Sequence, residues 1–330
     1  MEQAQNICLR VKDLRTNFYT DRGVVHSVRG VSFDVAEGEM LGIVGESGCG
    51  KSVTAFSILN QVKHPGKVDG GEVYFRGKDV LKLSESEMRK LRGSSMSMIF
   101  QEPLTALNPA FSIGWQIGEA YRLQGERDKR VIREKTVDIL RRVKLPEPEI
   151  RMKEYPYQFS GGMRQRALIA LALACKPELV FADEPTTALD VTVQAEILDL
   201  IQSLQAEMKM SVVLISHNLN LIGERCGRVL VFYAGRIVEQ ADTAELFRHP
   251  SHPYTVGLLG SLLSIRQEGE IELRTMPGEV PNMLNEIHSC SFAPRCPYAS
   301  GRCFTEEPEL TEIAPGHACS CHRFSKGGDR

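Results

Sequence analysis

The sequence predicts an α/β fold with a mainly parallel sheet, to which an antiparallel β lobe, a helical lobe and a cysteine-rich C-terminal extension are attached. Three features predict it. From residue 40 onward, apolar strand-like runs alternate with helical patterns. The first 35 residues are strand-like throughout, whereas residues 114–144 are helical. After about residue 265 the sequence pattern changes again, and the chain becomes rich in cysteine.

Composition excludes several classes of protein. The 330 residues are 42% hydrophobic and 25% charged, which is typical of a soluble globular protein. A formal net charge of −2 gives no electrostatic case for nucleic-acid binding, so no nucleic-acid partner is expected. The N-terminus lacks the basic start and apolar run of a signal peptide. No apolar run approaches the roughly 20 residues of a membrane span, so any membrane role must use a partner.

The N-terminal third reads mostly as strands. Residues 1–35 alternate apolar and polar side chains, with turns at 21–23 and 37–38. A short apolar run at 40–44 enters a glycine-rich loop, and residues 53–62 look helical. A turn at 69–71 is expected before the next strand, and residues 96–100 read as a buried strand.

The remaining core continues the alternation of helices and strands. Apolar spacings of three and four predict helix over 114–144, ended by Pro146 and Pro148. The following elements are a helix at 162–175, strand 179–184, helix 192–208, strand 211–215 and two short strands in 228–241. We therefore expect one domain over residues 1–262, with its helical lobe at about 104–175, and an extension over 263–330.

A phosphate-binding loop lies between the strand at 40–44 and the helix that follows. It fits the pattern G-x-x-x-x-G-K-[ST] and consists of Gly45, Glu46, Ser47, Gly48, Cys49, Gly50, Lys51 and Ser52, with Val53 next in the helix. The glycines let backbone N–H groups surround phosphate oxygens, and Lys51 adds a cation. The hydroxyl of Ser52 can bind Mg²⁺, and the following helix adds its positive N-terminal end. The motif predicts ATP as the ligand. A chance glycine-rich turn is a poor alternative, because strand, loop and helix follow in the required order.

Two acids end the apolar strand at 179–184. Asp183 suits indirect Mg²⁺ coordination, and Glu184 suits orienting or deprotonating an attacking water. Adjacent acids on a buried strand are costly unless a cation or a proton compensates them. Alone they are equally explained by a strand that ends in solvent, but beside a phosphate loop they indicate ATP hydrolysis.

A second glycine-rich segment opens the helix predicted at 162–175. Ser160, Gly161, Gly162 and Met163 leave backbone N–H groups unhindered, which makes an anion site without its own lysine. The alternative is an ordinary serine-capped helix start. With its neighbours, this segment resembles the signature of ABC ATPases, in which two subunits bind two ATP molecules head to tail. The resemblance implies that these residues complete the ATP site of a partner subunit.

Other segments resemble motifs of the same family in the same order. Gln101 resembles the glutamine of the Q-loop, which contacts Mg²⁺, and residues 188–190 resemble the D-loop. His217 resembles the switch histidine that contacts the γ-phosphate, and Lys51 and Glu184 complete the implied catalytic set. Tyr19 or Phe18 is expected to stack on adenine. Met163, Cys49 and Asn218, which follows His217, stand where many members carry other residues, although the implied catalytic residues are intact.

The C-terminal segments resemble the peptide and nickel importer branch of that family. The resemblance lies in residues 183–192, 252–255, 277–281 and 292–299. Five of the nine cysteines lie in the last 41 residues: Cys290, Cys296, Cys303, Cys319 and Cys321. Without an export signal, metal binding is a better explanation than disulfides. Four thiolates suit a [4Fe–4S] cluster or a zinc ion, and reduced thiols without metal are the remaining alternative.

The resemblance implies an iron–sulfur cluster on Cys290, Cys296, Cys303 and Cys321, with Cys319 as a spare or alternative ligand. Its expected role is structural, although a redox sensor that gates an ATPase stays open. The implied machine is an importer of peptides or related solutes. Its implied partners are a second ATPase subunit, two transmembrane permeases and an extracytoplasmic peptide-binding protein, and the chain would lie at the cytoplasmic face of the inner membrane. The alternative is an ABC ATPase that acts away from membranes.

Overall fold

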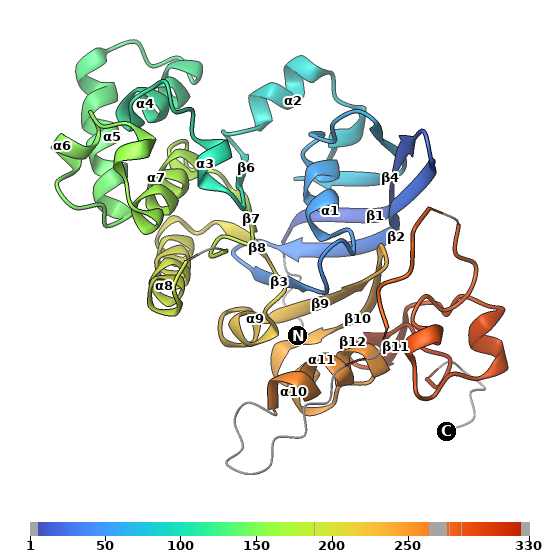
Figure 1. Cartoon of the computed structure of the whole chain (residues 1–330). Helices are drawn as coiled ribbons and strands as arrows, with labels where there is room; N and C mark the ends of the chain where they lie inside the picture. Colours follow the sequence, from blue (N-terminus) through green and yellow to red (C-terminus); the bar gives the residue numbers. More distant parts are fainter. Residues whose placement is uncertain (1–5, 188, 264–275, 277, 285, 325–330) are drawn as a thin grey trace. The chain divides into compact units, whose positions relative to one another are not determined.

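The structure is a computed structural model that describes residues 6–187, 189–263, 276, 278–284 and 286–324. It contains two compact units, each formed by separate stretches of the chain. The first unit comprises residues up to 8, 36–39 and 83–214. The second comprises 9–35, 40–82 and the described residues from 215 onward (Figure 1).

The first unit combines buried strands with the helical lobe. Its strands are β6 (Met96–Ile99), β7 (Leu179–Asp183) and most of β8 (Ser211–Ser216). Its helices are α2 (Glu85–Leu91), α3 (Pro103–Ala106), α4 (Ile113–Leu123), α5 (Lys129–Arg142), α6 (Pro148–Arg151), α7 (Gly161–Leu173) and α8 (Val191–Met208), with a 3-10 turn at Pro156–Gln158. β6 and β7 pair in parallel, and every residue of both is buried, as expected for strands covered on both faces.

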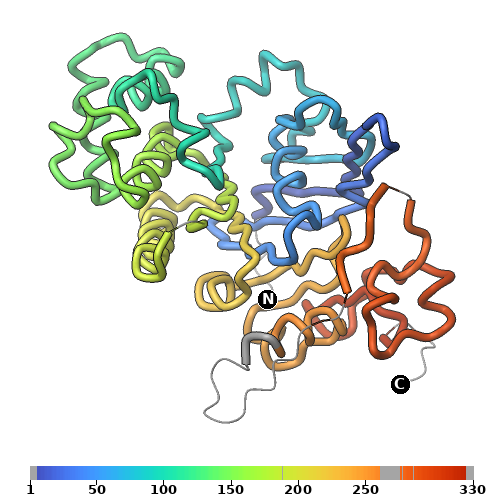
Figure 2. Tube along the Cα trace, in the orientation of Figure 1, coloured from blue at the N-terminus to red at the C-terminus, as the bar shows by residue number. Residues whose placement is uncertain are grey.

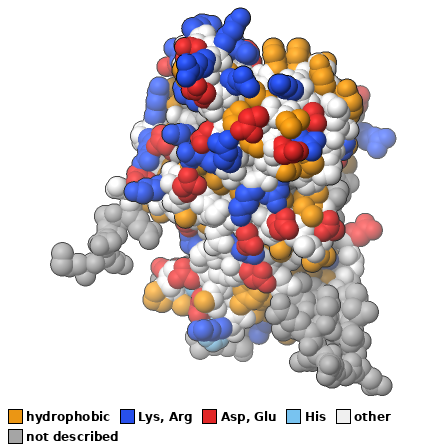
Figure 3. All heavy atoms as spheres, turned by 90° about the vertical axis from the view of Figure 1, so that its left-hand side faces the viewer, with side chains coloured by type: hydrophobic (Ala, Val, Ile, Leu, Met, Phe, Trp, Pro, Cys, Tyr) orange, Lys and Arg blue, Asp and Glu red, His pale blue; other side chains and the backbone are white. Residues whose placement is uncertain are grey.

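The helical lobe follows the predicted pattern with one difference. The helical stretch expected at 114–144 is two helices, α4 and α5, because residues 124–128 leave the helical path. Asp128 caps α5 by accepting from the backbone N–H groups of Arg130 and Val131. Figure 3 shows acidic and basic side chains intermixed over one face of the molecule. On α5, Arg142 forms an ion pair with Asp138.

The second unit contains two sheets. The smaller has the order β2 (Gly23–Ala36), β1 (Ile7–Thr20), β4 (Gly66–Phe75) and β5 (Lys78–Asp79), followed by a 3-10 turn at Val80–Lys82. Its β1–β4 and β4–β5 pairs are antiparallel, which confirms the β lobe. The larger runs β11 (Thr311–Ala314), β12 (His317–Cys319), β10 (Arg236–Asp242), β9 (Arg228–Tyr233) and β3 (Met40–Val44). The helices of the second unit are α1 (Lys51–Ile58), α9 (Leu219–Arg225), α10 (Thr243–Arg248) and α11 (Pro253–Leu263), and it has 3-10 turns at Ala293–Arg295 and Gly301–Phe304.

Two expectations about the strands are wrong. The sheet is mixed rather than mainly parallel: β3 and β9 are parallel, but β9–β10, β10–β12 and β11–β12 are antiparallel. The turn expected at 69–71 is a point inside the continuous strand β4, where the register against β1 shifts. Gly71 has φ 98°, and a Cβ there would lie 2.6 Å from the Cα of Leu14, so only glycine fits this irregularity.

The C-terminal extension is built into the second unit. Its strand β12 pairs with β10, with Cys319 opposite Glu239. In Figures 1 and 2 the extension also lies beside the N-terminal strands, where the backbone N–H of His26 donates to the carbonyl of Met283 at 2.9 Å. The predicted boundary at residue 263 adjoins residues 264–275, which lie outside the described ranges, and it stays a prediction. None of the helices in the described ranges combines the length and hydrophobicity needed to cross a membrane.

Candidate nucleotide-binding site

The phosphate loop joins β3, in which every residue is buried, to the first turn of α1. Gly50 caps α1 in the left-handed region at φ 97°, and a Cβ there would lie 2.2 Å from the carbonyl oxygen of Ser27. A side chain at this position would push the loop away from β2, so the glycine is a structural requirement. Ser47 and Gly48 are exposed at the tip of the loop, whereas Cys49 is buried beneath it.

Lys51 is buried and its ammonium group is held by the loop itself. Nζ donates to the carbonyl oxygens of Gly45 and Glu46 at 2.8 and 2.9 Å. These carbonyls keep the cation at the mouth of the loop, where a phosphate oxygen would take their place as its partner. Ser52 and Val53 follow in α1 and are half-buried. Burial raises the pKa of the Cys49 thiol, which therefore stays protonated, in keeping with a role through its backbone.

The first unit brings together two residues that were predicted from separate motifs. Glu184 follows the buried Asp183 at the end of β7, and its Oε2 accepts from Nε2 of Gln101 and Oγ1 of Thr187, each at 3.0 Å. Glu184 has φ 43°, a left-handed conformation that costs a residue other than glycine about 1 kcal/mol. The two donors hold the carboxylate in one orientation, as a group that activates water requires.

The signature segment begins α7 in the first unit. Ser160 caps the helix by accepting from the backbone N–H of Met163 at 3.3 Å. Ser160 and Gly161 are exposed, and Gly162 and Met163 are half-buried. The serine cap expected of an ordinary helix start is therefore present. The N-terminus of this 13-residue helix is also accessible, as an anion site requires.

The predicted switch histidine and the candidates for adenine stacking lie in the second unit. His217 is exposed directly after β8, and Asn218 caps α9 through its side chain. Tyr19 is 50% exposed, and its hydroxyl donates to Asp69 at 2.8 Å, which fixes the ring. Phe18 packs toward Gly66, where a Cβ would lie 2.6 Å from its ring, so Tyr19 has the freer face for stacking. In the D-loop, Ala188 lies outside the described residues.

Comparisons with known proteins agree with this arrangement. The ABC transporter family matches residues 28–187, and the family "Oligopeptide/dipeptide transporter, C-terminal region" matches residues 238–303. A probable peptide ABC transporter ATP-binding protein of Sinorhizobium fredii is 51% identical over 97% of this chain and 96% of the relative. The chain belongs to the family of ABC transporter ATP-binding proteins. It is an ATPase of that family.

Two further relatives and one solved structure are similar to this ABC ATPase. The oligopeptide transport ATP-binding protein OppD of Escherichia coli is 45% identical over 98% of this chain and 95% of the relative. The dipeptide transport ATP-binding protein DppD of the same species is 43% identical over 95% and 96%. The dimeric structure of the bacterial ABC transporter cassette MJ0796 matches with a TM-score of 0.65 and 26% identity, over 71% of this chain and 98% of that one.

The extension of this ABC ATPase gathers its cysteines. Burial is the main cause that raises the pKa values of Cys290 (to about 11), Cys296 and Cys321, and neighbouring cysteines, Cys303 among them, raise each of them further. The four predicted ligands are thus close enough to interact. However, within the described ranges no three His, Cys, Asp or Glu side chains are arranged to hold one metal ion. The metal prediction is therefore not borne out by the geometry.

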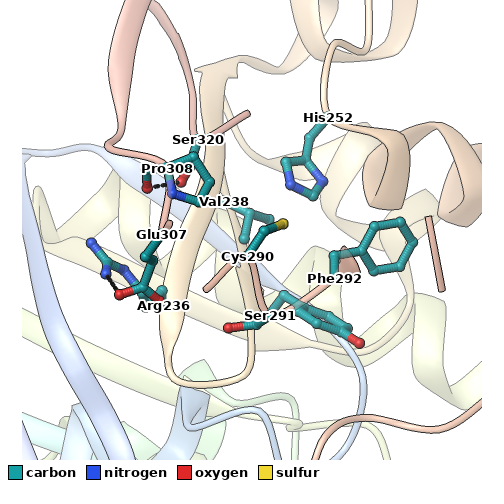
Figure 4. Close-up of a pocket in the computed structure, with 10 residues that line it drawn as sticks. Arg236, Val238, His252, Cys290, Ser291, Phe292, Glu307, Pro308 and Ser320 are labelled. Atoms are coloured by element: carbon teal, nitrogen blue, oxygen red, sulfur yellow. Dashed lines mark hydrogen bonds and ion pairs between the residues drawn. The ribbon is translucent and has the colours of Figure 1, made fainter. Parts of the chain in front are cut away.

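Cys319 has a different environment from the other four cysteines. It is fully buried in β12, and burial, with the charge of Glu239 next, raises its pKa far above the usual range. Cys290 instead lines a small cavity together with His252, Phe292 and Ser320 (Figure 4). Cys321 is half-buried, and its choice over Cys319 as the fourth ligand stays a prediction.

Some residues of the site were not found from the sequence. Thr187 holds Glu184, and the Tyr254 hydroxyl accepts from the backbone N–H of Glu46 at 2.9 Å. Arg295 forms an ion pair with the side chain of Glu46. Tyr254 and Arg295 stand in segments that resemble the peptide-importer branch, which was the available signal, but a spacing of more than 200 residues does not reveal a contact.

Proposed function

We propose that this ABC ATPase powers the import of peptides or related solutes through a membrane transporter. Its match to peptide-transport ATP-binding proteins over at least 95% of its length carries the proposal. The match of residues 238–303 to a region named for oligopeptide and dipeptide transporters supports it independently. Neither feature favours an ABC ATPase that acts away from membranes.

In the proposed mechanism, the loop at 45–52 binds the phosphates of ATP, with Lys51 on the β- and γ-phosphates. Tyr19 stacks on adenine. The residues that would hold Mg²⁺ are Ser52, Gln101 and Asp183, and the ion would supply positive charge to the phosphates. The hydrogen bonds from Gln101 and Thr187 to Glu184 support a role for that carboxylate in orienting the attacking water.

His217 then contacts the γ-phosphate, and Ser160, Gly161, Gly162 and Met163 complete the ATP site of a second ABC ATPase subunit. The exposed start of α7 supports the role of these residues in a partner's ATP site. α7 has 13 residues, and its accessible N-terminus can bind a phosphate held by another chain. Closure of two such subunits around ATP, and reopening after hydrolysis, would drive the membrane subunits.

We place the docking site for the two permease subunits on the helical lobe of the first unit. Leu104 of α3 is 62% exposed, and exposed Phe111 and Trp115 stack at 4.0 Å beside it in sequence. Exposed apolar and aromatic side chains of this kind mark protein interfaces. The subunit would then sit at the cytoplasmic face of the inner membrane, with an extracytoplasmic binding protein to supply peptides.

Transport assays test the function. We expect the chain, purified with its permeases and second ATPase in vesicles, to drive ATP-dependent uptake of a labelled dipeptide or oligopeptide when the binding protein is added. Glu184→Gln should abolish uptake while ATP stays bound. ATP hydrolysis with no permease recovered from membranes would contradict the proposal.

A pair of variants tests the docking surface. Leu104→Glu should prevent recovery with the permeases, because a buried carboxylate in an apolar interface is costly. Val256→Glu is the matched control, because Val256 is an exposed apolar residue (44%) of α11 in the second unit and does not belong to the helical lobe. Equal recovery of both variants would place docking elsewhere.

We also propose that Cys290, Cys296, Cys303 and Cys321 hold an iron–sulfur cluster that pins the extension. The number and spacing of cysteines support the proposal, because four thiolates within residues 290–321 suit a [4Fe–4S] cluster. Anaerobic purification should give about four irons per chain and a thiolate-to-iron absorption band. Zinc at one per chain, or no metal, would overturn this assignment.

A further inference from the structure

The phosphate loop is held from outside by the cysteine-bearing extension. The guanidinium of Arg295 makes a two-pronged ion pair with Glu46, Nη1 to Oε2 at 3.0 Å and Nη2 to Oε1 at 3.1 Å. The Arg295 side chain is only 6% exposed and that of Glu46 27%. Paired hydrogen bonds between a planar guanidinium and a carboxylate fix orientation as well as distance, and burial limits the screening by water.

Arg295 is itself fixed by an aromatic cluster, which consists of Tyr233, Tyr254 and Phe292. Nη1 donates to the Tyr233 hydroxyl at 3.3 Å, and the guanidinium lies 5.8 Å from the ring centres of both Tyr233 and Phe292. Tyr254 and Phe292 contact edge to face at 5.6 Å. The same cluster holds the backbone of the loop, because the Tyr254 hydroxyl accepts from the Glu46 N–H. Glu46 is thus held at both its side chain and its backbone.

Glu46 matters for phosphate binding for two reasons. Its carbonyl is one of the two acceptors that hold the Lys51 ammonium group, so moving Glu46 moves a partner of that cation. It is also the one acidic residue among residues 45–52. An unpaired carboxylate in a loop that receives a polyphosphate repels it, and this repulsion is stronger in a half-buried site than in water.

We propose that Arg295 is a positioning residue for ATP binding, which neutralises Glu46 and holds the phosphate loop in its binding shape. The inference rests on the proposed phosphate-binding role of residues 45–52. It makes the extension part of the nucleotide site, although the extension contributes no atom to the phosphate loop. Because Arg295 directly precedes Cys296, a displacement of that cysteine would also displace Arg295 and its ion pair with Glu46.

A second connection runs through Arg29 of β2, which is buried. Its guanidinium donates to Ser291, next to Cys290, at 3.0 Å, and to Glu307 at 2.7 Å. Its backbone N–H donates to Gly235, whose own N–H donates to the carbonyl of Cys49 in the loop. Both connections begin at residues adjacent to the predicted metal-binding cysteines, so the extension supports the loop at two points.

Calorimetric titration of the full chain with ATP and Mg²⁺ tests the inference. We expect Arg295→Ala to weaken ATP binding about 10-fold, the loss typical of a charge-assisted hydrogen-bonded pair. The double variant Arg295→Ala/Glu46→Ala should bind more tightly than Arg295→Ala alone, because the repelling carboxylate is gone. The loss in Arg295→Ala should shrink at high salt. Arg295→Lys, which keeps the charge without the fork, should lie between wild type and Arg295→Ala.

Two further variants separate the possible failures. Arg302→Ala is the matched control, because Arg302 lies in the same extension and pairs with Glu306 at an exposed position, so its ATP affinity should equal wild type. Lys51→Ala must lose ATP binding; if it does not, the proposed phosphate site is wrong. If Lys51→Ala fails to bind but Arg295→Ala binds as wild type, the inference is overturned. It is also overturned if the double variant binds no better than Arg295→Ala.

Discussion

The phosphate loop of the second unit and the signature segment of the first are both glycine-rich entries to a helix, yet they are held very differently. Tyr254 of α11 and Arg295 of the extension hold Glu46, and the backbone N–H of Gly235 donates to the carbonyl of Cys49. The close approach of β2 leaves room only for glycine at position 50. The signature has its own serine cap, and its first residues are exposed. One site is organised by its own chain, and the other presents backbone N–H groups outward.

The difference separates two kinds of anion site. A loop that must bind a highly charged ligand with high affinity gains from being organised in advance, because less conformational freedom is lost on binding. A helix end that binds only a nucleotide already held by another subunit needs access more than affinity. Variants in the two segments should therefore differ in whether they change ATP binding by the isolated chain.

The largest effect is expected at the loop. Lys51→Ala should weaken ATP binding by the isolated chain about 100-fold, because a buried cation that pairs with phosphate is lost. Titration calorimetry measures this, and the melting temperature without nucleotide checks folding. A loss smaller than that of Arg295→Ala would mean that the loop does not use its lysine as the main phosphate contact.

The signature should respond only in the assembled transporter. Gly161→Glu adds an acid at the first position of α7, which the helix dipole tolerates but a partner's nucleotide phosphate does not. We expect ATP turnover of the transporter to fall about 10-fold or more, while ATP affinity of the isolated chain stays the same. Lys129→Glu, at the first position of α5, is the control. A drop in both variants would remove the distinction between the two segments.

The free energy of unfolding is expected to depend on pH, because a histidine is buried near the residues that support the loop. Burial lowers the pKa of His252 to about 3, below its value of about 6.5 in the unfolded chain, so protons bind preferentially to the unfolded chain. Its contribution to stability is complete above pH 6.5 and declines below it, by up to about 1.4 kcal/mol per pH unit. Urea unfolding at pH 7 and pH 5 measures the decline. His252→Gln should flatten it, whereas exposed His249→Gln should leave it unchanged.

The smallest effect concerns Thr187, which was found only in the structure. Thr187→Val removes one hydrogen bond to Glu184 and should reduce ATP turnover about 5-fold, a loss of about 1 kcal/mol. ATP affinity should not change, because Thr187 does not belong to the loop. Steady-state hydrolysis gives turnover and KM separately. A rise in KM with constant turnover would show that Thr187 acts on binding instead.

The sequence was sufficient for elements whose signals are local. The buried apolar runs of β3, β7 and β8, the cap of α7 and the order of the motifs were all visible in it. It failed where a contact between distant segments decides the outcome. The turn expected at 69–71 became a strand irregularity because β1 lies against Gly71, and the sheet became mixed because β10 and β12 pair antiparallel.

The sequence by itself therefore determined the family, the loop that is expected to bind phosphate and the acids that follow β7, because periodicity and short motifs report backbone conformation over a few residues. Only the tertiary structure decided that Gln101 contacts Glu184, that Cys319 is fully buried in β12 opposite Glu239, and that Arg295 holds Glu46. Residues 46 and 295 meet because the extension folds back along β10, and no local preference of either residue encodes that pairing.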